Sequence, residues 1–211
     1  RVKRCKYVDE IVLAIPDTDS DKPLRELGNA YNVTVFSGSE NDLVERYYRA
    51  ALATNTDLVV RLPADNTTPE PEEIDRIIDH HICLNRPGFS SNLSVINDSG
   101  YPDGIGAEVF DFSLLKDVRI LEENPFKREH LHLNFFDYSS QKAVDIDWCP
   151  ISSLKCPVAF RRPELILDVN TLEQYTFMKA LYEALYPRNS EFSIIDIIDW
   201  YDNEYQGPTK F

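Results

Sequence analysis

The 211-residue sequence has no apolar run that approaches the length of a membrane span, and no signal-peptide pattern. It also has no excess of positive charge. Lysine and arginine together number 22 and aspartate and glutamate 36, which gives a net charge of −14. A surface this acidic repels nucleic acids and anionic membranes, so we exclude both as partners. An anionic substrate would therefore need local arginines, lysines or a bound metal ion.

The four cysteines form no CxxC motif and no other metal-binding spacing; they are Cys5, Cys83, Cys149 and Cys156. We interpret them as reduced thiols of a cytoplasmic protein. The sequence contains no internal repeats, low-complexity segments or linkers. Its length and its 43% hydrophobic content fit one sizeable core. We therefore predict a single domain over residues 1–211, with residues 125–162 as an excursion that packs on a partner.

Strands and helices alternate in the first third of the chain. Strands are predicted over residues 10–15, 33–36 and 58–62, with an amphipathic helix after each of the first two. This alternation favours an α/β fold with a parallel sheet and right-handed crossovers. Residues 58–62 are almost wholly apolar and rich in β-branched side chains, which is typical of a strand buried on both faces. Pro63 ends that strand because it has no N–H to donate.

The rest of the chain continues with mixed elements. Ser39, Ser113, Thr171 and Ser193 are expected to begin helices as N-cap residues. Further helices are predicted after Thr68 and over residues 128–136, and further strands over residues 89–93, 106–112, 143–148 and 165–169.

Polar side chains follow three of the predicted strands. Ser39 and Arg46 follow residues 33–36, Asp65 follows residues 58–62, and Asp168 lies near the end of residues 165–169. The loops after parallel strands emerge at one edge of a sheet, so these side chains are expected to converge. Asp65 and Asp168 would then share a Mg²⁺ ion with phosphate oxygens. The alternative for Asp65 is a loop residue that caps the next helix.

A second group of polar residues has two open interpretations. Tyr101, Asp103 and Glu108 belong to a glycine-containing turn, which either contacts a hydroxylated substrate or only introduces a strand. His130 is either a substrate contact or a structural histidine. The Asp145-Ile146-Asp147 segment has the DxD form used by glycosyltransferases, but it lies inside a predicted strand.

Five segments that occur in this order carry a resemblance to a known family. They are GSENDLVERYY (38–48), VRLPADN (60–66), YPDG with EVF (101–104 and 108–110), REH (128–130) and DVNT (168–171). Over nearly its whole length the chain resembles the cytidylyltransferases that include the acylneuraminate and KDO enzymes. It looks most like their spore-coat polysaccharide biosynthesis branch.

This resemblance implies a fold, a reaction and a set of site residues. The fold is the three-layer nucleotide-diphospho-sugar transferase fold, with a mixed, mostly parallel sheet. The reaction joins CMP from CTP to a sugar or sugar acid and releases pyrophosphate, with Mg²⁺ as cofactor and a homodimer as the usual assembly. The implied metal site is Asp65 with Asp168 and Asn170, although the family usually has a second Asp where Asn170 stands. The implied nucleotide-binding residues are Ser39, Arg46 and Arg61, and the implied substrate-binding residues are Tyr101, Asp103, Glu108, Arg128 and His130.

One part of the family pattern has no counterpart here, namely its first strand and the phosphate-binding loop that follows. We therefore expect the natural gene product to be longer by about one βα unit, roughly 30 residues. Without that strand, an apolar slot would be left between neighbouring strands. The alternative function is a catalytically inactive, cytidylyltransferase-like binding or assembly subunit. A glycosyltransferase of related fold ranks last, because its DxD motif belongs in the loop that here holds Asp65 alone.

Overall fold

The structure is a computed structural model that describes residues 1–207. Its strands are β1 (Val12–Pro16), β2 (Thr34–Gly38), β3 (Leu58–Arg61), β4 (Phe89–Ser91), β5 (Glu108–Asp111), β6 (Phe136–Asp137), β7 (Lys142–Ala143) and β8 (Ile151–Ser153). Its α-helices are α1 (Lys22–Ala30), α2 (Leu43–Ala53), α3 (Pro71–Ile82), α4 (Phe112–Leu121), α5 (Pro125–Glu129), α6 (Leu172–Leu185) and α7 (Ile194–Asn203). Short 3-10 helices cover Val2–Arg4, Asp19–Asp21, Leu131–Asn134 and Val158–Phe160.

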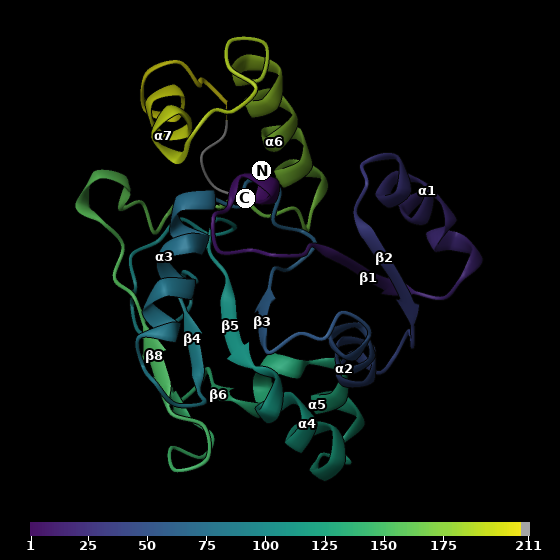
Figure 1. Ribbon diagram of the computed structural model, residues 1–211. Coiled ribbons are helices and arrows are strands. Elements are labelled where there is room, and N and C mark those ends of the chain that lie inside the picture. The colour runs from purple at the N-terminus through teal and green to yellow at the C-terminus, as the bar shows by residue number, and fades with distance from the viewer. Residues whose placement is uncertain (208–211) are drawn as a thin grey trace.

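The main sheet has four strands in the order β3-β5-β4-β8 (Figure 1). β5 runs antiparallel to both β3 and β4, whereas β4 and β8 are parallel. β1 and β2 form a separate parallel pair. The mixed sheet expected from the sequence is therefore present. The prediction that residues 58–62 belong to a parallel sheet is wrong, because β3 is the first strand of this sheet and its neighbour β5 runs the opposite way.

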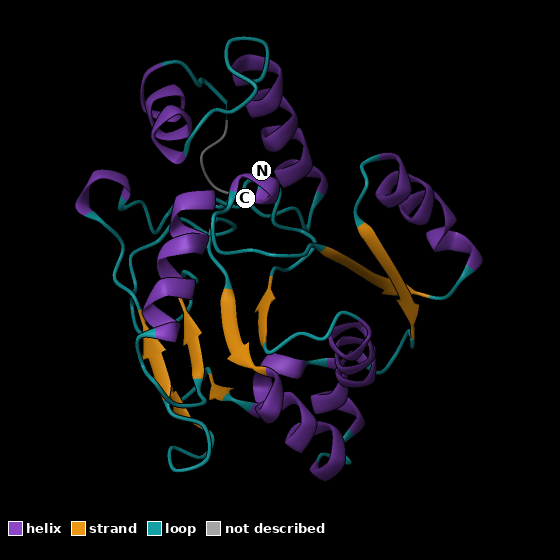
Figure 2. Ribbon diagram, viewed as in Figure 1, coloured by secondary structure: helices purple, strands orange, loops and turns teal. Residues whose placement is uncertain are grey.

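Alternation along the strands distributes their side chains between two apolar layers. Val109 packs with the apolar stripe of α3, which includes Ile74 and Ile77. Phe110, the next residue, points to the other face and packs with Phe135, 5.0 Å away between ring centroids. Helices therefore cover both faces of the sheet, with α3 on one face and α2 and α4 on the other (Figure 2). This gives the three-layer arrangement expected from the sequence.

A third apolar cluster lies where the chain returns toward the sheet. It joins α6 and α7 to the segment before α6 through Leu165, Leu167, Phe177 and Trp200. Capping boxes fix the starts of both helices, and the predicted N-cap roles of Thr171 and Ser193 are confirmed. The side chains of Thr171 and Ser193 accept the N–H of the third residue of α6 and of α7.

Three other local predictions are wrong. Asp42, not Ser39, is the N-cap of α2, since its Oδ1 accepts the Glu45 N–H at 2.9 Å. Helix α4 begins one residue before Ser113, with Asp111 as its N-cap. The helix predicted over residues 128–136 is divided between α5 and a 3-10 turn at His130.

Two predicted strands are also shorter or absent. Only the start of residues 143–148 pairs, as β7, because Asp145 then turns the chain by accepting the N–H groups of Asp147 and Trp148. Residues 165–169 form isolated bridges, which pair Asp168 with Asn66 and Ile166 with Asp103. They therefore connect two loops and extend no sheet.

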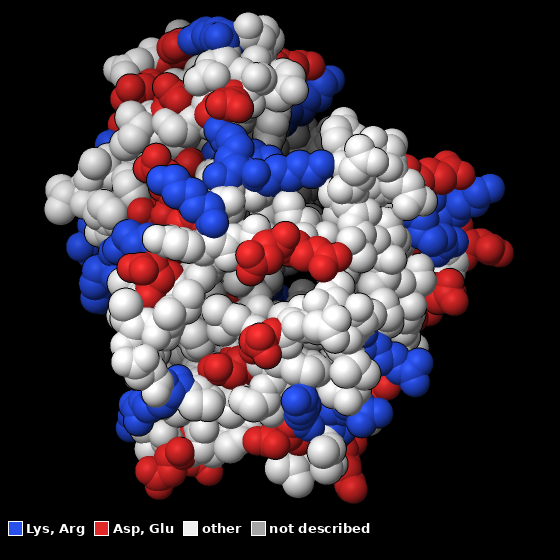
Figure 3. Space-filling view, in the orientation of Figure 1, with Lys and Arg blue, Asp and Glu red and all other residues white. Residues whose placement is uncertain are grey.

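The β1–β2 pair stands apart from β3 in the view of Figure 1. In the same orientation, Figure 3 shows a hollow between β3 and this pair, with acidic side chains above it and below it. Within residues 1–207, the structure contains no helix that combines the length and the apolar character of a membrane span.

Candidate active site

Three loops meet beyond the end of β3, and each carries an aspartate. The Val169 N–H donates to the Asp65 carbonyl oxygen at 3.1 Å, which ties the loop after β3 to the segment before α6. The backbone of Asp103 joins the same segment from the other side. Its N–H donates to Leu165 at 2.9 Å, and its carbonyl oxygen accepts from Leu167 at 3.1 Å. Asp65, Asp103 and Asp168 are therefore held together by main-chain bonds.

Gly104 makes this close approach sterically feasible. It has a φ of +86°, a conformation that side-chain-bearing residues rarely adopt. A Cβ atom at this position would lie 2.8 Å from the carbonyl carbon of Leu167 and 2.9 Å from the Asp168 nitrogen. The glycine that the sequence marked as part of a turn thus allows two loops to touch.

The carboxylates of this cluster are not fully satisfied. Asp65 Oδ1 and Asp168 Oδ1 are both buried and have no hydrogen-bond partner. The pKa of Asp168 is raised, first by burial and then by the negative charges of Asp103 and Asp65. Buried carboxylate oxygens without donors are costly, and a cation or a donor ligand would satisfy them.

The donor set fits a magnesium ion that is shared with a substrate. Mg²⁺ is commonly held by one or two carboxylates together with water and phosphate oxygens. Asp65 and Asp168 supply two such carboxylates. Among the residues that the structure describes, no group of three or more His, Cys, Asp or Glu side chains is arranged to hold a metal on its own. A dedicated all-protein metal cage is thus absent from residues 1–207.

Arg46 and Ser39, the predicted nucleotide-binding residues, lie together at the start of α2. One Arg46 guanidinium nitrogen donates to the Ser39 carbonyl oxygen at 2.7 Å. Arg46 Nε is buried without a partner, and burial lowers the pKa of this guanidinium. The Ser39 hydroxyl accepts the Asp42 N–H at 3.1 Å. Arg46 therefore retains donor capacity for an anion, whereas Ser39 serves mainly to order the loop.

Arg61 and Glu108 pair with each other. Their side chains form an ion pair at 2.5 Å, and the Tyr138 hydroxyl donates to the other Glu108 oxygen at 3.0 Å. His132 lies beside this group with a buried, unpaired Nδ1, and burial lowers its pKa. The sequence prediction missed Tyr138 and His132. The REH motif pointed to the right segment, but the 3-10 turn brings His132 to this group, with its ring edge-on to Tyr138 at 5.2 Å between centroids.

The structure does not place Tyr101 at the site. Its side chain is fully buried, and its hydroxyl donates to Glu73 and accepts from Arg76. Burial, followed by the Glu73 carboxylate, raises the pKa of this phenol. Tyr101 therefore belongs to the packed interior, which corrects its assignment as a substrate contact.

Arg128 and His130 also have structural partners. Arg128 donates to Asp42 at 2.8 Å and to the Glu122 carbonyl oxygen at 2.8 Å, which fastens α5 to the start of α2. The His130 ring lies edge-on to Phe126, 4.5 Å between centroids. Arg128 is thus occupied by protein groups, and His130 packs at the end of the short helix.

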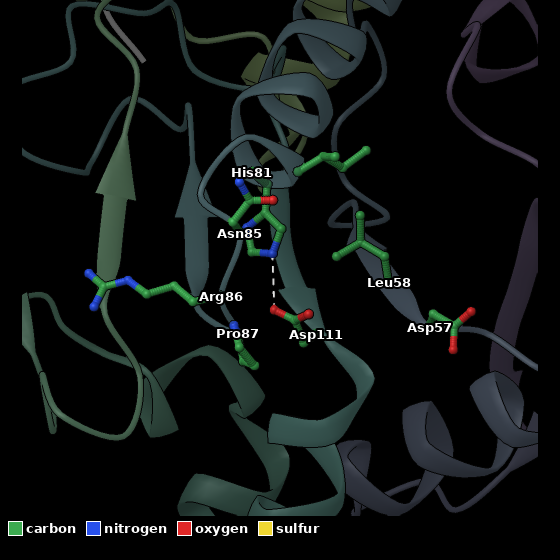
Figure 4. A pocket seen from close by; sticks show the side chains of 8 residues that line it. Asp57, Leu58, His81, Asn85, Arg86, Pro87 and Asp111 are labelled. Atoms are coloured by element: carbon green, nitrogen blue, oxygen red, sulfur yellow. Dashed lines mark hydrogen bonds and ion pairs between the residues drawn. The ribbon is translucent and has the colours of Figure 1, made fainter.

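A separate pocket of about 360 Å³ lies at the other end of these strands, where β3 begins and β5 ends (Figure 4). His81 contacts Asp111 there at 3.1 Å and Ser90 at 2.8 Å. These three residue types are those of a hydrolytic triad, but Ser90 is completely buried and cannot reach a substrate. The arrangement therefore fastens α3 to β4 and β5, and His81 has a structural role.

The sheet order, its flanking layers and the loops beyond β3 define the fold of the cytidylyltransferases. The structure resembles a cytidylyltransferase from Leptospira borgpetersenii serovar Hardjo-bovis with a TM-score of 0.82 and 24% identity, over 99% of this chain and 85% of that one. It also resembles a CMP:2-keto-3-deoxy-manno-octonic acid synthetase complexed with CTP, with a TM-score of 0.58 and 12% identity. That likeness covers 86% of this chain and 84% of the synthetase.

Curated proteins are similar in sequence as well. The chain is 28% identical over 176 residues to the spore coat polysaccharide biosynthesis protein SpsF of Bacillus subtilis, and the match covers 83% of this chain and 68% of SpsF. It is 25% identical over 200 residues to an uncharacterised protein of Methanocaldococcus jannaschii, which covers 94% and 76% of the two chains. No family model matches the chain. The resemblance to cytidylyltransferases, and to their spore-coat branch, is confirmed.

Proposed function

We propose that this protein is a nucleotidyltransferase that joins CMP from CTP to a sugar or sugar acid and releases pyrophosphate, for the synthesis of a surface polysaccharide. The observation that carries the proposal is the pair of buried, unpartnered carboxylate oxygens on Asp65 and Asp168, on loops joined by backbone hydrogen bonds. The fold supports it, since one structural relative is a cytidylyltransferase and another was observed with CTP.

Asp65 and Asp168 are the residues that would hold the Mg²⁺ ion. When bound, the ion neutralises phosphate oxygens and stabilises the charge that develops in nucleotidyl transfer. The two carboxylates contribute position and charge, because backbone bonds fix the loops that carry them. Asp103 adds negative charge beside Asp168. This charge favours cation binding.

Arg46 is the cation in our proposal that meets the nucleotide phosphates. Its Nε is buried and has no protein partner, so a phosphate oxygen would satisfy a donor that the fold leaves open. On a chain with a net charge of −14, such a local cation is needed to hold an anionic substrate.

We assign the neighbourhood of Tyr138 and His132 to the hydroxylated substrate; Glu108, which was predicted as a substrate contact, is buried and supports these two side chains instead. Arg61 holds one Glu108 oxygen and Tyr138 the other, so the group is fixed before any ligand binds. The unpaired Nδ1 of His132 remains available to a sugar hydroxyl. The nucleophile in this scheme is a hydroxyl group of the substrate.

The test is CTP binding by calorimetry with and without Mg²⁺, together with release of pyrophosphate. Both are measured on the 211-residue chain and on the product of the complete natural reading frame. We expect Mg²⁺-dependent binding that Asp65→Ala abolishes. Asp79→Ala, which removes an exposed carboxylate on α3, is the matched control and should leave binding unchanged. Full turnover by the Asp65→Ala protein would refute the assigned role.

The alternative is a catalytically inactive binding or assembly subunit of the same fold. One observation favours it, namely that Arg61 and Arg128, two cations assigned to ligands, are paired with Glu108 and Asp42. Absence of CTP binding and of pyrophosphate release in both the 211-residue chain and the complete product would support this alternative. Release of pyrophosphate by the complete product would exclude it.

A further inference from the structure

Asn170 makes a direct contact with one of the two carboxylates assigned to the metal. Its Nδ2 donates to Asp168 Oδ2 at 2.6 Å. The other oxygen of that carboxylate, Oδ1, is buried and has no partner. The two carboxylate oxygens of Asp168 therefore differ: Oδ2 accepts a hydrogen bond from Asn170, whereas Oδ1 accepts none.

We propose that Asn170 is a positioning residue and not a metal ligand: it holds Asp168 so that Oδ1 is left for a divalent cation shared with Asp65. This inference rests on the proposed function. It places the second carboxylate of the site two residues before Asn170, at Asp168. Asn170 would then act on the cation only through the carboxylate that it orients.

The chemistry of the two groups fixes the direction of the hydrogen bond. An ionised carboxylate only accepts hydrogen bonds, so the NH₂ end of the Asn170 amide must face Asp168. Such a bond to a charged acceptor is short and roughly twice as strong as a neutral one. The amide nitrogen that points at Asp168 therefore carries hydrogens and cannot coordinate a cation.

Asn170 is itself held by the start of α6. Its backbone N–H donates to Gln174 Oε1 at 2.7 Å, and the same oxygen accepts the Thr171 N–H at 2.9 Å. The Gln174 side chain thus sets the position of Asn170, which in turn sets the orientation of Asp168. Mutation of residues that orient metal ligands through hydrogen bonds typically lowers metal affinity by about 10–100-fold.

The local charge explains why a neutral side chain suits this position. Asp168 already lies within the electrostatic reach of Asp103 and Asp65. An aspartate at position 170 with the same geometry would bring a fourth negative group to hydrogen-bonding distance of Asp168, where like charges repel. Asparagine replaces that repulsion with a donor.

Binding of Mn²⁺ alone to the 211-residue chain tests the proposal. It is measured by calorimetry and by the decrease of the electron paramagnetic resonance signal of free Mn²⁺. We expect Asn170→Ala to weaken Mn²⁺ binding by about 10–100-fold, and Asp65→Ala and Asp168→Asn to abolish it. Thr171→Ala is the matched control. It removes the hydroxyl that caps α6 but leaves the contact between Asn170 and Asp168, so its Mn²⁺ affinity should equal that of the parent.

A second measurement uses the metal-free protein. In NMR spectra, the chemical shifts of the Asn170 side-chain amide should change in the Asp168→Asn variant and remain unchanged in the Thr171→Ala variant. Because Asn170 is exposed, its truncation leaves the core intact and folding can be checked by circular dichroism. An Asn170→Ala protein with unchanged Mn²⁺ affinity, beside an Asp65→Ala protein that binds none, would overturn the positioning role and leave the proposed function standing. Abolished binding in Asn170→Ala would identify a ligand instead, and no binding by the parent chain would overturn both the metal site and this inference.

Discussion

Arg61 and Glu108 face each other across β3 and β5 and form an ion pair that is almost fully removed from solvent. They are register partners in the sheet, and their side chains are 14% and 1% exposed. Burial alone would lower the pKa of Arg61, but the Glu108 carboxylate outweighs burial and raises it. Arg61 is therefore held in place by Glu108, and the pair is a fixed element of the sheet.

We expect Arg61→Met to be strongly destabilising, because it leaves Glu108 buried without its cation. Loss of one partner of a buried pair costs about 3–5 kcal/mol. The measurement is the free energy of unfolding in urea. The double variant Arg61→Met with Glu108→Leu should recover much of the loss, since it removes both charges. A single variant that loses less than about 1 kcal/mol would show that the pair is well hydrated in solution.

The contact between Gly104 and residues 167–168 predicts a second outcome. Gly104→Ala should destabilise the protein by about 1–3 kcal/mol, because an alanine would have to adopt a positive φ and would clash with backbone atoms. Gly38→Ala is the control. The neighbours of an added Cβ there are side-chain atoms of Phe36 and Arg46 at 3.0 Å and 3.2 Å, which can move. Equal unfolding midpoints for the two variants would contradict the close approach of the loops.

His81 predicts a dependence of stability on pH. Burial lowers its pKa below the ordinary value of 6.5, against the raising effect of Asp111. The folded state thus favours the neutral ring, so the contribution of His81 is fully present above pH 6.5 and is lost as the pH falls through the lowered folded pKa. The stability difference between the parent and His81→Gln, measured by urea unfolding, should therefore shrink from pH 7.5 toward pH 5.

A matched control for this profile is His80→Gln, which changes the preceding residue of the same helix. His80 Nε2 contacts Ser152 on β8 at 2.6 Å, whereas His81 contacts Ser90 on β4 and Asp111 on β5. A constant difference between the parent and His81→Gln across this pH range would show that His81 has the same pKa in both states.

The four cysteines should differ sharply in reactivity. All are free, as the sequence predicted, but only Cys83 is exposed. Burial raises the pKa of Cys149 to about 12 and those of Cys5 and Cys156 to about 11, so these three are protonated and unreactive at neutral pH. An aromatic disulfide reagent should label one thiol rapidly in the native protein and four after unfolding. Cys83→Ser should remove the rapid phase, and a rapid phase that survives would assign it to another cysteine.

The sequence predicted best those features that depend on a few neighbouring residues. The N-cap roles of Thr171 and Ser193 were recognised because each depends only on the few residues that follow it. Residues 165–169 look like a strand by composition. Their backbone partners, however, are two loops much earlier in the chain, at Asn66 and at Asp103. Composition does not record such partners, so the absence of a strand was not predictable.

The same distinction applies to the site. Asp65 and Asp168 were found because both follow apolar runs, and the structure brings their loops together. Tyr101 and Arg128 belong to motifs of the same resemblance, yet burial in one case and protein partners in the other remove them from the site. Neither property can be read from the order of residues. The dimer expected through residues 125–162 stays a prediction.

The position of β3 at the end of its sheet has a consequence for how the protein behaves in concentrated solution. Within residues 1–207, β3 is hydrogen-bonded on one side alone, to β5, so its other edge keeps backbone donors and acceptors that no neighbouring strand occupies. At neutral pH, the net charge of −14 keeps molecules apart. Near the isoelectric point of about 4.7 this repulsion vanishes, and open edges can meet. Colloidal stability is thus supplied by charge, and it will fail first in mildly acidic solution.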